Sequence, residues 1–151
     1  MQVKNLPDGS RLYHDAHGLM QVHDFGGGVS LHVRRGIMTA DFATHVIEDG
    51  ERQMNRFRRF VLMVDGTETR MHTTEFREVM TNWFRTRETA VVHMLIRSKL
   101  LDMALTVANL TMGSPRAKAY TEASEWEAVG CREAAAFVRR PLSVPVDAGA
   151  D

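Results

Sequence analysis

Two short segments near the N-terminus carry the pattern of β-strands. Over residues 29–35 apolar and polar side chains alternate, which is the period of a strand with one covered face. Residues 19–25 form a second short segment, and three consecutive glycines at 26–28 join the two. Glycine readily adopts the positive φ angles that a tight reversal needs. The pattern therefore predicts a β-hairpin over residues 19–35.

The remainder of the chain alternates between strand and helix patterns. Two apolar runs predict buried strands at residues 60–64 and 90–96, and a short strand is expected at 117–121. Apolar side chains recur at helical spacing in four ranges, residues 40–55, 73–84, 98–110 and 124–138. Gly50 weakens the middle of the first helix, and Ser124 opens the last one with a capping box.

The predicted order of elements is β-β-α-β-α-β-α-β-α. Strands that alternate with helices favour an α/β fold with a mixed, mostly parallel sheet that follows the N-terminal β-hairpin. Because the strands are buried, we expect covering elements on both faces of the sheet. Residues 1–18 are predicted to be a turn-rich leader, residues 19–140 one α/β domain, and residues 141–151 a flexible tail.

Composition narrows the classes of function. The 151 residues suffice for one soluble domain. Nineteen basic residues balance nineteen acidic ones, which argues against a general nucleic-acid binder. The single cysteine, Cys131, excludes an internal disulfide, a cysteine-rich zinc site and an iron–sulfur cluster. No signal peptide and no run of about 18 apolar residues are recognised, so we predict a cytoplasmic protein without a membrane span.

No catalytic or metal-binding motif stands out in the sequence. A Gly-x-Ser-x-Gly motif is absent, and Cys131 lies within a predicted helix. The glycines at 26–28 lack the Lys-Ser/Thr pair of a phosphate-binding loop. The seven histidines show no His-x-x-x-His pair and no cysteine companion. We therefore predict that the protein is not an enzyme and has no cofactor or metal.

Three stretches carry a resemblance to a known family. They are the strand-to-helix passage over residues 29–41, the buried strand that ends Leu62-Met63-Val64-Asp65-Gly66, and the turn Leu95-Ile96-Arg97-Ser98-Lys99 with its helix. Together with the order of elements, they resemble the STAS domain of bacterial anti-sigma-factor antagonists. The likeness is stronger to STAS-like (SpoIIAA-like) proteins, which are related in shape to lipid-binding CRAL-TRIO domains. It covers residues 19–138.

The resemblance implies a regulatory module that binds a protein partner, either a regulatory kinase or an anti-sigma-type protein. In those antagonists the partner kinase phosphorylates a Ser or Thr at the start of a helix, in a motif close to Asp-Ser-Ser-Gly. The matching residues here are Met71-His72-Thr73-Thr74, which lack the Asp and the Gly but keep a hydroxyl. Thr73 is therefore the expected phosphoacceptor and Thr74 the weaker choice, whereas plain helix capping by Thr73 is the simpler role.

Two polar residues are further candidates for contact with a partner or ligand. Asp65 is expected where a buried strand ends, at the edge where open α/β sheets place ligands. A turn-forming Asp65-Gly66 pair explains the same residues without a function. His72 lies beside the candidate phosphoacceptors. A weaker hypothesis is an enzyme that uses Asp65 and His72.

The helix predicted at 98–110 is more apolar than a surface helix needs to be. Leu100, Met103 and Val107 lie beyond the stripe that would face the core. They are candidates for lining a pocket for a small apolar ligand or lipid, or for forming a homodimer surface. Core filling by methionine is the commoner role of such residues.

Overall fold

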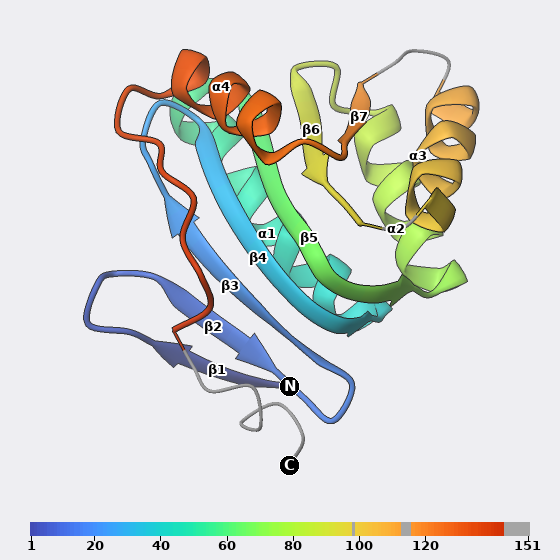
Figure 1. Ribbon diagram of the computed structural model, residues 1–151, viewed down its shortest axis with the longest axis horizontal. Coiled ribbons are helices and arrows are strands. Elements are labelled where there is room, and N and C mark those ends of the chain that lie inside the picture. Colours follow the sequence, from blue (N-terminus) through green and yellow to red (C-terminus); the bar gives the residue numbers. More distant parts are fainter. Residues whose placement is uncertain (98, 113–115, 144–151) are drawn as a thin grey trace.

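The computed structural model describes residues 1–97, 99–112 and 116–143. Its centre is a seven-stranded mixed sheet in which the strands lie side by side in sequence order (Figure 1). Neighbours from β1 to β4 are antiparallel, and neighbours from β4 to β7 are parallel. The strands are β1 (Gln2–Asn5), β2 (Arg11–His14), β3 (Gly18–Asp24), β4 (Val29–Met38), β5 (Phe60–His72), β6 (Ala90–Leu95) and β7 (Ala117–Tyr120).

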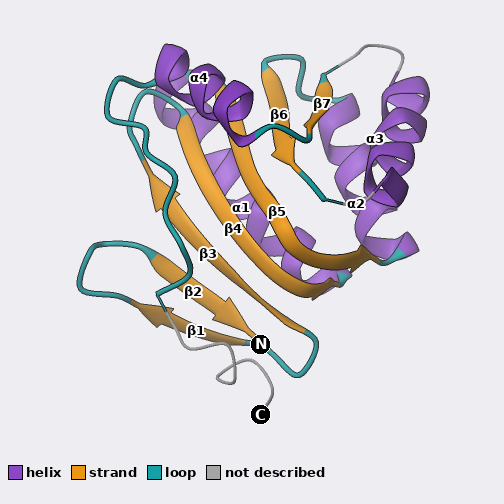
Figure 2. Ribbon diagram, viewed as in Figure 1, coloured by secondary structure: helices purple, strands orange, loops and turns teal. Residues whose placement is uncertain are grey.

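Helices cover both faces of the sheet, as expected (Figure 2). They are α1 (Ala40–Phe57), α2 (Thr74–Arg85), α3 (Lys99–Met112) and α4 (Ala123–Glu133). The parallel strands follow one another in a single direction, so crossovers of one hand place α1, α2 and α3 on the same face. Their core with the sheet includes Phe42, Phe60 and Trp83. On the other face, α4 and the segment after it build a smaller core around Trp126 and Phe137.

The prediction of a leader over residues 1–18 missed two strands. β1 and β2 both lie in this range and extend the antiparallel part of the sheet. Leu12 and Tyr13 of β2 are buried, and the Tyr13 ring stacks on His45 of α1 at 4.4 Å between centroids. Each strand has only four residues, which is too short to display a period, and the turn residues between them favour a leader instead.

β5 is longer than the predicted strand at 60–64 and continues to His72. Its first half pairs with both β4 and β6, but β6 ends where Leu95 lies opposite Asp65. Beyond this point β5 pairs with β4 alone, and its side chains become more polar and more exposed. The Asp65-Gly66 pair is therefore part of a strand, and the prediction that Asp65 follows its C-terminal end is wrong.

Two predictions at the C-terminal end also need correction. α4 begins at Ala123 with Glu122 as its N-cap, so Ser124 lies inside the helix and opens no capping box. The helix ends at Glu133, because the following turn brings Phe137 edge-on against Trp126, 5.5 Å between ring centroids. Ser143 is held to buried Gln21 by hydrogen bonds of 2.9 and 3.0 Å. The rest of the predicted tail, residues 144–151, lies outside the described residues.

Gly50 allows close packing between α1 and α2, although glycine is a poor helix former. A Cβ at this position of α1 would lie 2.5 Å from the Trp83 ring of α2 and 3.1 Å from Phe60. We expect Gly50→Ala to lower the free energy of unfolding by about 1–2 kcal/mol, because overpacking outweighs the gain of about 1 kcal/mol in helix propensity. Urea denaturation measures this change. In a Trp83→Leu background the penalty should disappear, and a stabilising effect of Gly50→Ala in the wild-type background would contradict this packing role.

Candidate functional site

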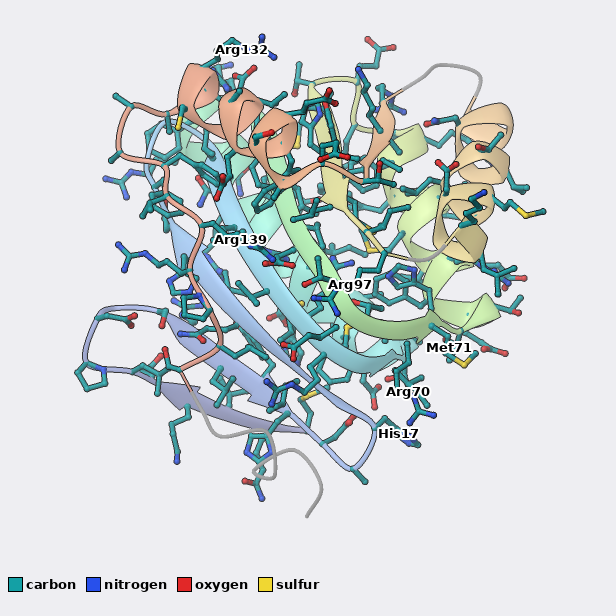
Figure 3. All side chains as sticks on the ribbon, viewed as in Figure 1. His17, Arg70, Met71, Arg97, Arg132 and Arg139 are labelled. Carbon is teal, nitrogen blue, oxygen red and sulfur yellow. The ribbon has the colours of Figure 1, made fainter. Side chains whose placement is uncertain are left out.

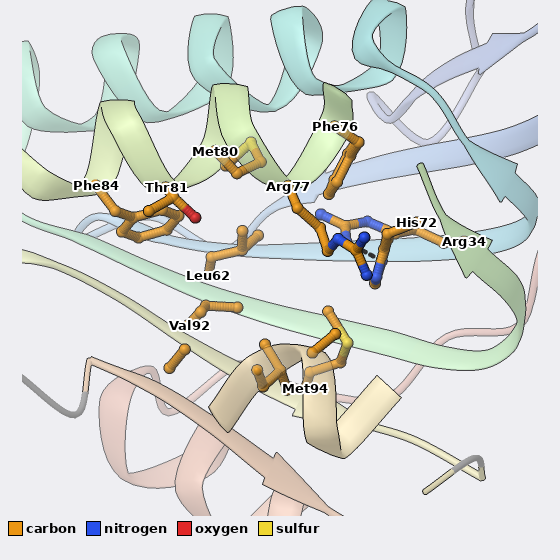
Figure 4. Close-up of a pocket in the computed structure, with 13 residues that line it drawn as sticks. Arg34, Leu62, His72, Phe76, Arg77, Met80, Thr81, Phe84, Val92 and Met94 are labelled. Atoms are coloured by element: carbon orange, nitrogen blue, oxygen red, sulfur yellow. Dashed lines mark hydrogen bonds between the residues drawn. The ribbon is translucent and has the colours of Figure 1, made fainter. Parts of the chain in front are cut away.

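A cavity of about 70 Å³ lies between α2, α3 and the face of the sheet (Figure 4). Most of its wall is apolar and comes from four elements, α2, α3, β5 and β6. The main apolar residues are Leu62, Phe76, Met80, Phe84, Met94 and Leu105. The cavity therefore lies beside α3, where the sequence predicted a pocket, and its size suits part of a small molecule.

Polar side chains gather at one end of this cavity. Arg34 of β4 is only 2% exposed, and its Nη1 donates a hydrogen bond of 3.5 Å to Nε2 of His72, the last residue of β5. The His72 ring stacks on Phe76 with 4.8 Å between centroids, and the Arg34 guanidinium carbon lies 5.4 Å from the centre of the same Phe76 ring. Arg77 lines the cavity from α2, and Figure 4 shows the three polar side chains together.

The charges at this end are positive. Burial lowers the pKa of the Arg34 guanidinium to about 9, so it still carries its charge at neutral pH. Burial, followed by the charges of Arg34 and Arg77, lowers the pKa of His72 to about 3. His72 is therefore neutral and accepts the Arg34 hydrogen bond. No ion pair within the described part of the chain includes Arg34, and its Nε has no hydrogen-bond partner there.

The sequence pattern did not identify Arg34 as a site residue, because it predicts solvent on the face of β4 to which Arg34 belongs. The alternation predicts an open face for the polar residues between Val29, Leu31 and Val33. In the structure both faces of β4 are covered, and Ser30, His32 and Arg34 are all at most 2% exposed. A buried arginine in a central strand is rare. Its burial depends on the helices that cover β4, so the local sequence pattern does not show it.

Thr73 and Thr74 have different surroundings. Thr73 is the N-cap of α2 and accepts a hydrogen bond of 3.1 Å from the Phe76 backbone N–H, which confirms the capping role. Thr74 is the first residue of the helix and is exposed; its hydroxyl accepts a hydrogen bond of 3.2 Å from Arg77. Of the two hydroxyls, that of Thr74 is the more accessible. Phosphorylation of either residue stays a prediction.

Asp65 and His72 do not come together. Asp65 accepts hydrogen bonds of 2.8 Å from Arg139 and of 2.7 Å from the Thr67 hydroxyl, on the face that α4 and the C-terminal segment cover. Figure 3 shows Arg139 reaching across that face. His72 instead lines the cavity beneath α2. Between the two residues β5 has two register shifts against β4, and their partners on β4, Val33 and Met38, belong to the cores on opposite faces of the sheet. Asp65 and His72 therefore face opposite ways, which removes the basis for a joint catalytic site.

Leu100, Met103 and Val107 do not line this cavity. Among the described side chains of α3, Ala104 and Leu105 reach the cavity. The three predicted residues are 76%, 63% and 61% exposed and face an open groove between α3 and α2. The physical reason is the narrow contact of α3 with the sheet, which leaves its outer apolar stripe at the surface.

A second polar cluster is structural and lies between β4 and α1. His32 Nε2 donates a hydrogen bond of 2.7 Å to Asp49, and Arg52 donates one of 3.3 Å to the same carboxylate. Burial raises the pKa of Asp49, but the contacts with His32 outweigh it and leave the pKa below its usual range. Burial lowers the pKa of His32. A neutral imidazole therefore donates to an ionised carboxylate.

Metal sites, the cysteine and membrane-spanning helices can each be examined in the described part of the chain. Within it, no group of three or more His, Cys, Asp and Glu side chains is placed to hold a metal ion. Cys131 is exposed on α4. None of the helices in the described ranges is both long and apolar enough to cross a membrane.

The mixed sheet with α1, α2 and α3 on one face and α4 on the other defines an α/β domain of the SpoIIAA-like type. A solved structure supports this class: an uncharacterized protein of the DUF3478 family with a SpoIIAA-like fold, from Shewanella loihica PV-4. It superposes with a TM-score of 0.56 at 14% identity and covers 79% of this chain and 98% of that one. No protein-family model and no curated protein matches the sequence. The likeness confirms the predicted fold.

Proposed function

We propose that this chain is a non-enzymatic regulatory module that binds a partner protein through the groove between α2 and α3. The observation that carries the proposal is the exposed apolar stripe of α3. Leu100, Met103 and Val107 follow one another at spacings of three and four, which is how one helix presents anchors to another. The SpoIIAA-like fold supports a partner of the regulatory kinase or anti-sigma type.

The chemistry of the groove indicates what kind of partner segment fits. Its α3 wall is apolar, and its α2 wall carries Arg77 and Arg85 against a single acid, Glu78. An amphipathic helix with an apolar face and carboxylates along one edge complements both walls. We therefore infer that the partner docks such a helix, with its acidic edge on α2.

The Thr74 hydroxyl is the point at which a phosphate would regulate this contact. It opens α2, where unpaired backbone N–H groups and the helix dipole favour a phosphate, and Arg77 already contacts it. A phosphate there would occupy Arg77 and repel the carboxylates of the docked helix. Phosphorylation is thus expected to release the partner, with Thr74 rather than Thr73 as the acceptor.

A photo-crosslinking residue at position 103, introduced in the native cell, tests the groove. The matched control places the same residue at Glu125, an exposed position of α4. We expect one protein to be captured from position 103 only and then to bind the purified chain. Met103→Glu should weaken that binding at least tenfold, and Met103→Lys should weaken it less, because glutamate repels an acidic helix. Equal capture at both positions, or cross-links only to a second copy of this chain, would contradict the proposal.

The threonines give a separate prediction. Thr74→Glu should weaken binding of the captured partner several-fold, whereas Thr74→Ala should leave it unchanged. Thr73→Ala should instead lower the free energy of unfolding by about 1 kcal/mol, because the cap of α2 is lost, with no direct effect on binding. Isothermal titration calorimetry and urea denaturation separate the two effects. Tighter or unchanged binding by Thr74→Glu would contradict the switch.

A further inference from the structure

Among the described residues, no carboxylate forms an ion pair with the buried guanidinium of Arg34. Arg34 is only 2% exposed and lies at the end of an otherwise apolar cavity. Its neighbours are the face of Phe76 and the neutral His72 ring, which attract a cation but do not neutralise it. A buried charge is costly unless it is paired. An anion bound in the cavity would neutralise this buried charge.

Arg77 supplies a second positive charge at the polar end of the cavity. Arg77 lines the cavity from α2 and reaches the polar end beside Arg34 (Figure 4). One arginine comes from the central strand β4 and the other from the helix that covers it, so the fold itself brings them together. Guanidinium groups match a carboxylate well, because both are planar and can form two parallel hydrogen bonds.

We propose that this cavity binds a short-chain carboxylate, whose anionic end is held by Arg34 and Arg77 and whose hydrocarbon end fills the apolar part. The expectation of a small ligand beside α3 is thereby changed from an apolar molecule to an amphipathic anion. His72 positions the Arg34 guanidinium and stacks on Phe76, which closes one side of the polar end.

The dimensions set the length of the hydrocarbon end. The cavity measures about 70 Å³. An apolar cavity of about 150 Å³ holds the six carbons of benzene, so about half that volume suits on the order of three or four carbons. Butyrate is accordingly the best single probe. Acetate is too short to fill the apolar part, and octanoate is too long for the cavity as it stands.

The cavity and the outer groove share Arg77, Thr81 and Ala104, but each has residues of its own. Arg34 and Leu105 line only the cavity, and Leu100 and Met103 line only the groove among these two sites. Substitutions at Arg34 and Leu105 thus test carboxylate binding, whereas the Met103 variants test the partner protein. Failure of one proposal leaves the other standing.

Isothermal titration calorimetry at constant ionic strength tests the inference on the full chain. The probes are acetate, butyrate, hexanoate, octanoate and inorganic phosphate. We expect butyrate to bind best, with a Kd on the order of 1 mM or below for its six heavy atoms. Arg34→Met should weaken butyrate binding at least tenfold, and Arg34→Lys should restore part of it. Phosphate binding as tight as butyrate binding, or no preference for chain length, would overturn the inference.

A second variant keeps the test independent of any effect on folding at Arg34. Leu105→Phe retains both arginines but fills the apolar end, so it should weaken butyrate binding several-fold while acetate binding stays the same. Thermal unfolding gives a parallel readout, because a ligand of the native state raises the Tm. Butyrate should raise the Tm of the wild type and not that of Arg34→Met. Equal shifts in both proteins would show that Arg34 is only structural.

Discussion

Replacing Asp49 by alanine is expected to lower the free energy of unfolding by about 1–3 kcal/mol, because the change leaves the buried N–H donor of His32 without its hydrogen-bond acceptor. Asp49 is 2% exposed and accepts hydrogen bonds from His32, which is fully buried, and from Arg52. The His32 Nδ1 atom already has no partner among the described residues. Loss of Asp49 would leave the His32 imidazole with no hydrogen-bond partner among the described residues.

Chemical denaturation at pH 7 measures the effect of Asp49→Ala. Glu48→Ala is the matched control, since Glu48 is the preceding residue of α1 but is exposed and pairs only with His45 at 2.9 Å. We expect the control to change stability by no more than about 0.5 kcal/mol. Asp49→Asn keeps one hydrogen-bond acceptor and should fall between the two. A loss for Asp49→Ala no larger than that of the control would show that the pair does not stabilise the fold.

Mild acid is expected to destabilise the protein well before its carboxylates are protonated. The pKa is lowered, with burial as the largest cause, at four histidines: His23, His32, His72 and His93. Above a pH of about 6.5 neither the folded nor the unfolded state protonates them. Below that pH the unfolded chain binds protons at these histidines and the folded chain does not, so the free energy of unfolding falls as the pH decreases.

His72 supplies the clearest part of this pH dependence. Its folded pKa of about 3 leaves it neutral at pH 5, whereas the unfolded side chain is protonated there. Linkage gives about 1.4 kcal/mol per pH unit, so His72 alone accounts for about 2 kcal/mol between pH 6.5 and pH 5. The lowered pKa of Asp49 acts only at lower pH, as protonation then removes its stabilising effect.

Urea denaturation of the wild type and of His72→Gln at pH 7 and pH 5 isolates this contribution. The loss on acidification should be about 2 kcal/mol smaller in His72→Gln, because glutamine takes up no proton. The same comparison between pH 8 and pH 7 should show almost no difference between the two proteins. An identical acid response of wild type and variant would mean that His72 is protonated within the fold.

Much of the fold follows from local patterns in the sequence. The apolar run from Phe60 to Val64 identified a strand buried on both faces, and the spacing of apolar residues identified α2 with Thr73 as its cap. Three glycines identified the β3–β4 hairpin. These features depend on side chains that are close together in the sequence, so they can be predicted without the rest of the molecule.

The candidate sites depend on contacts that are distant along the chain. Arg34 belongs to a polar stripe that local alternation assigned to an open face, and only the packing of α1 and α2 onto β4 makes it a buried cation. The course of β5 beyond Asp65 depends on pairing with β4, although its own residues are polar. The pairing decided that Asp65 and His72 face opposite ways.

The sequence by itself determined a neutral α/β domain with an unusually apolar helix at residues 98–110 and a hydroxyl at the start of α2. Only the tertiary structure decided that this helix turns Leu100 and Met103 outward and that Arg34 and Arg77 line one cavity. The reason is physical. Periodicity shows which residues share a face of one element, whereas exposure and charge pairing depend on what the fold places against that face.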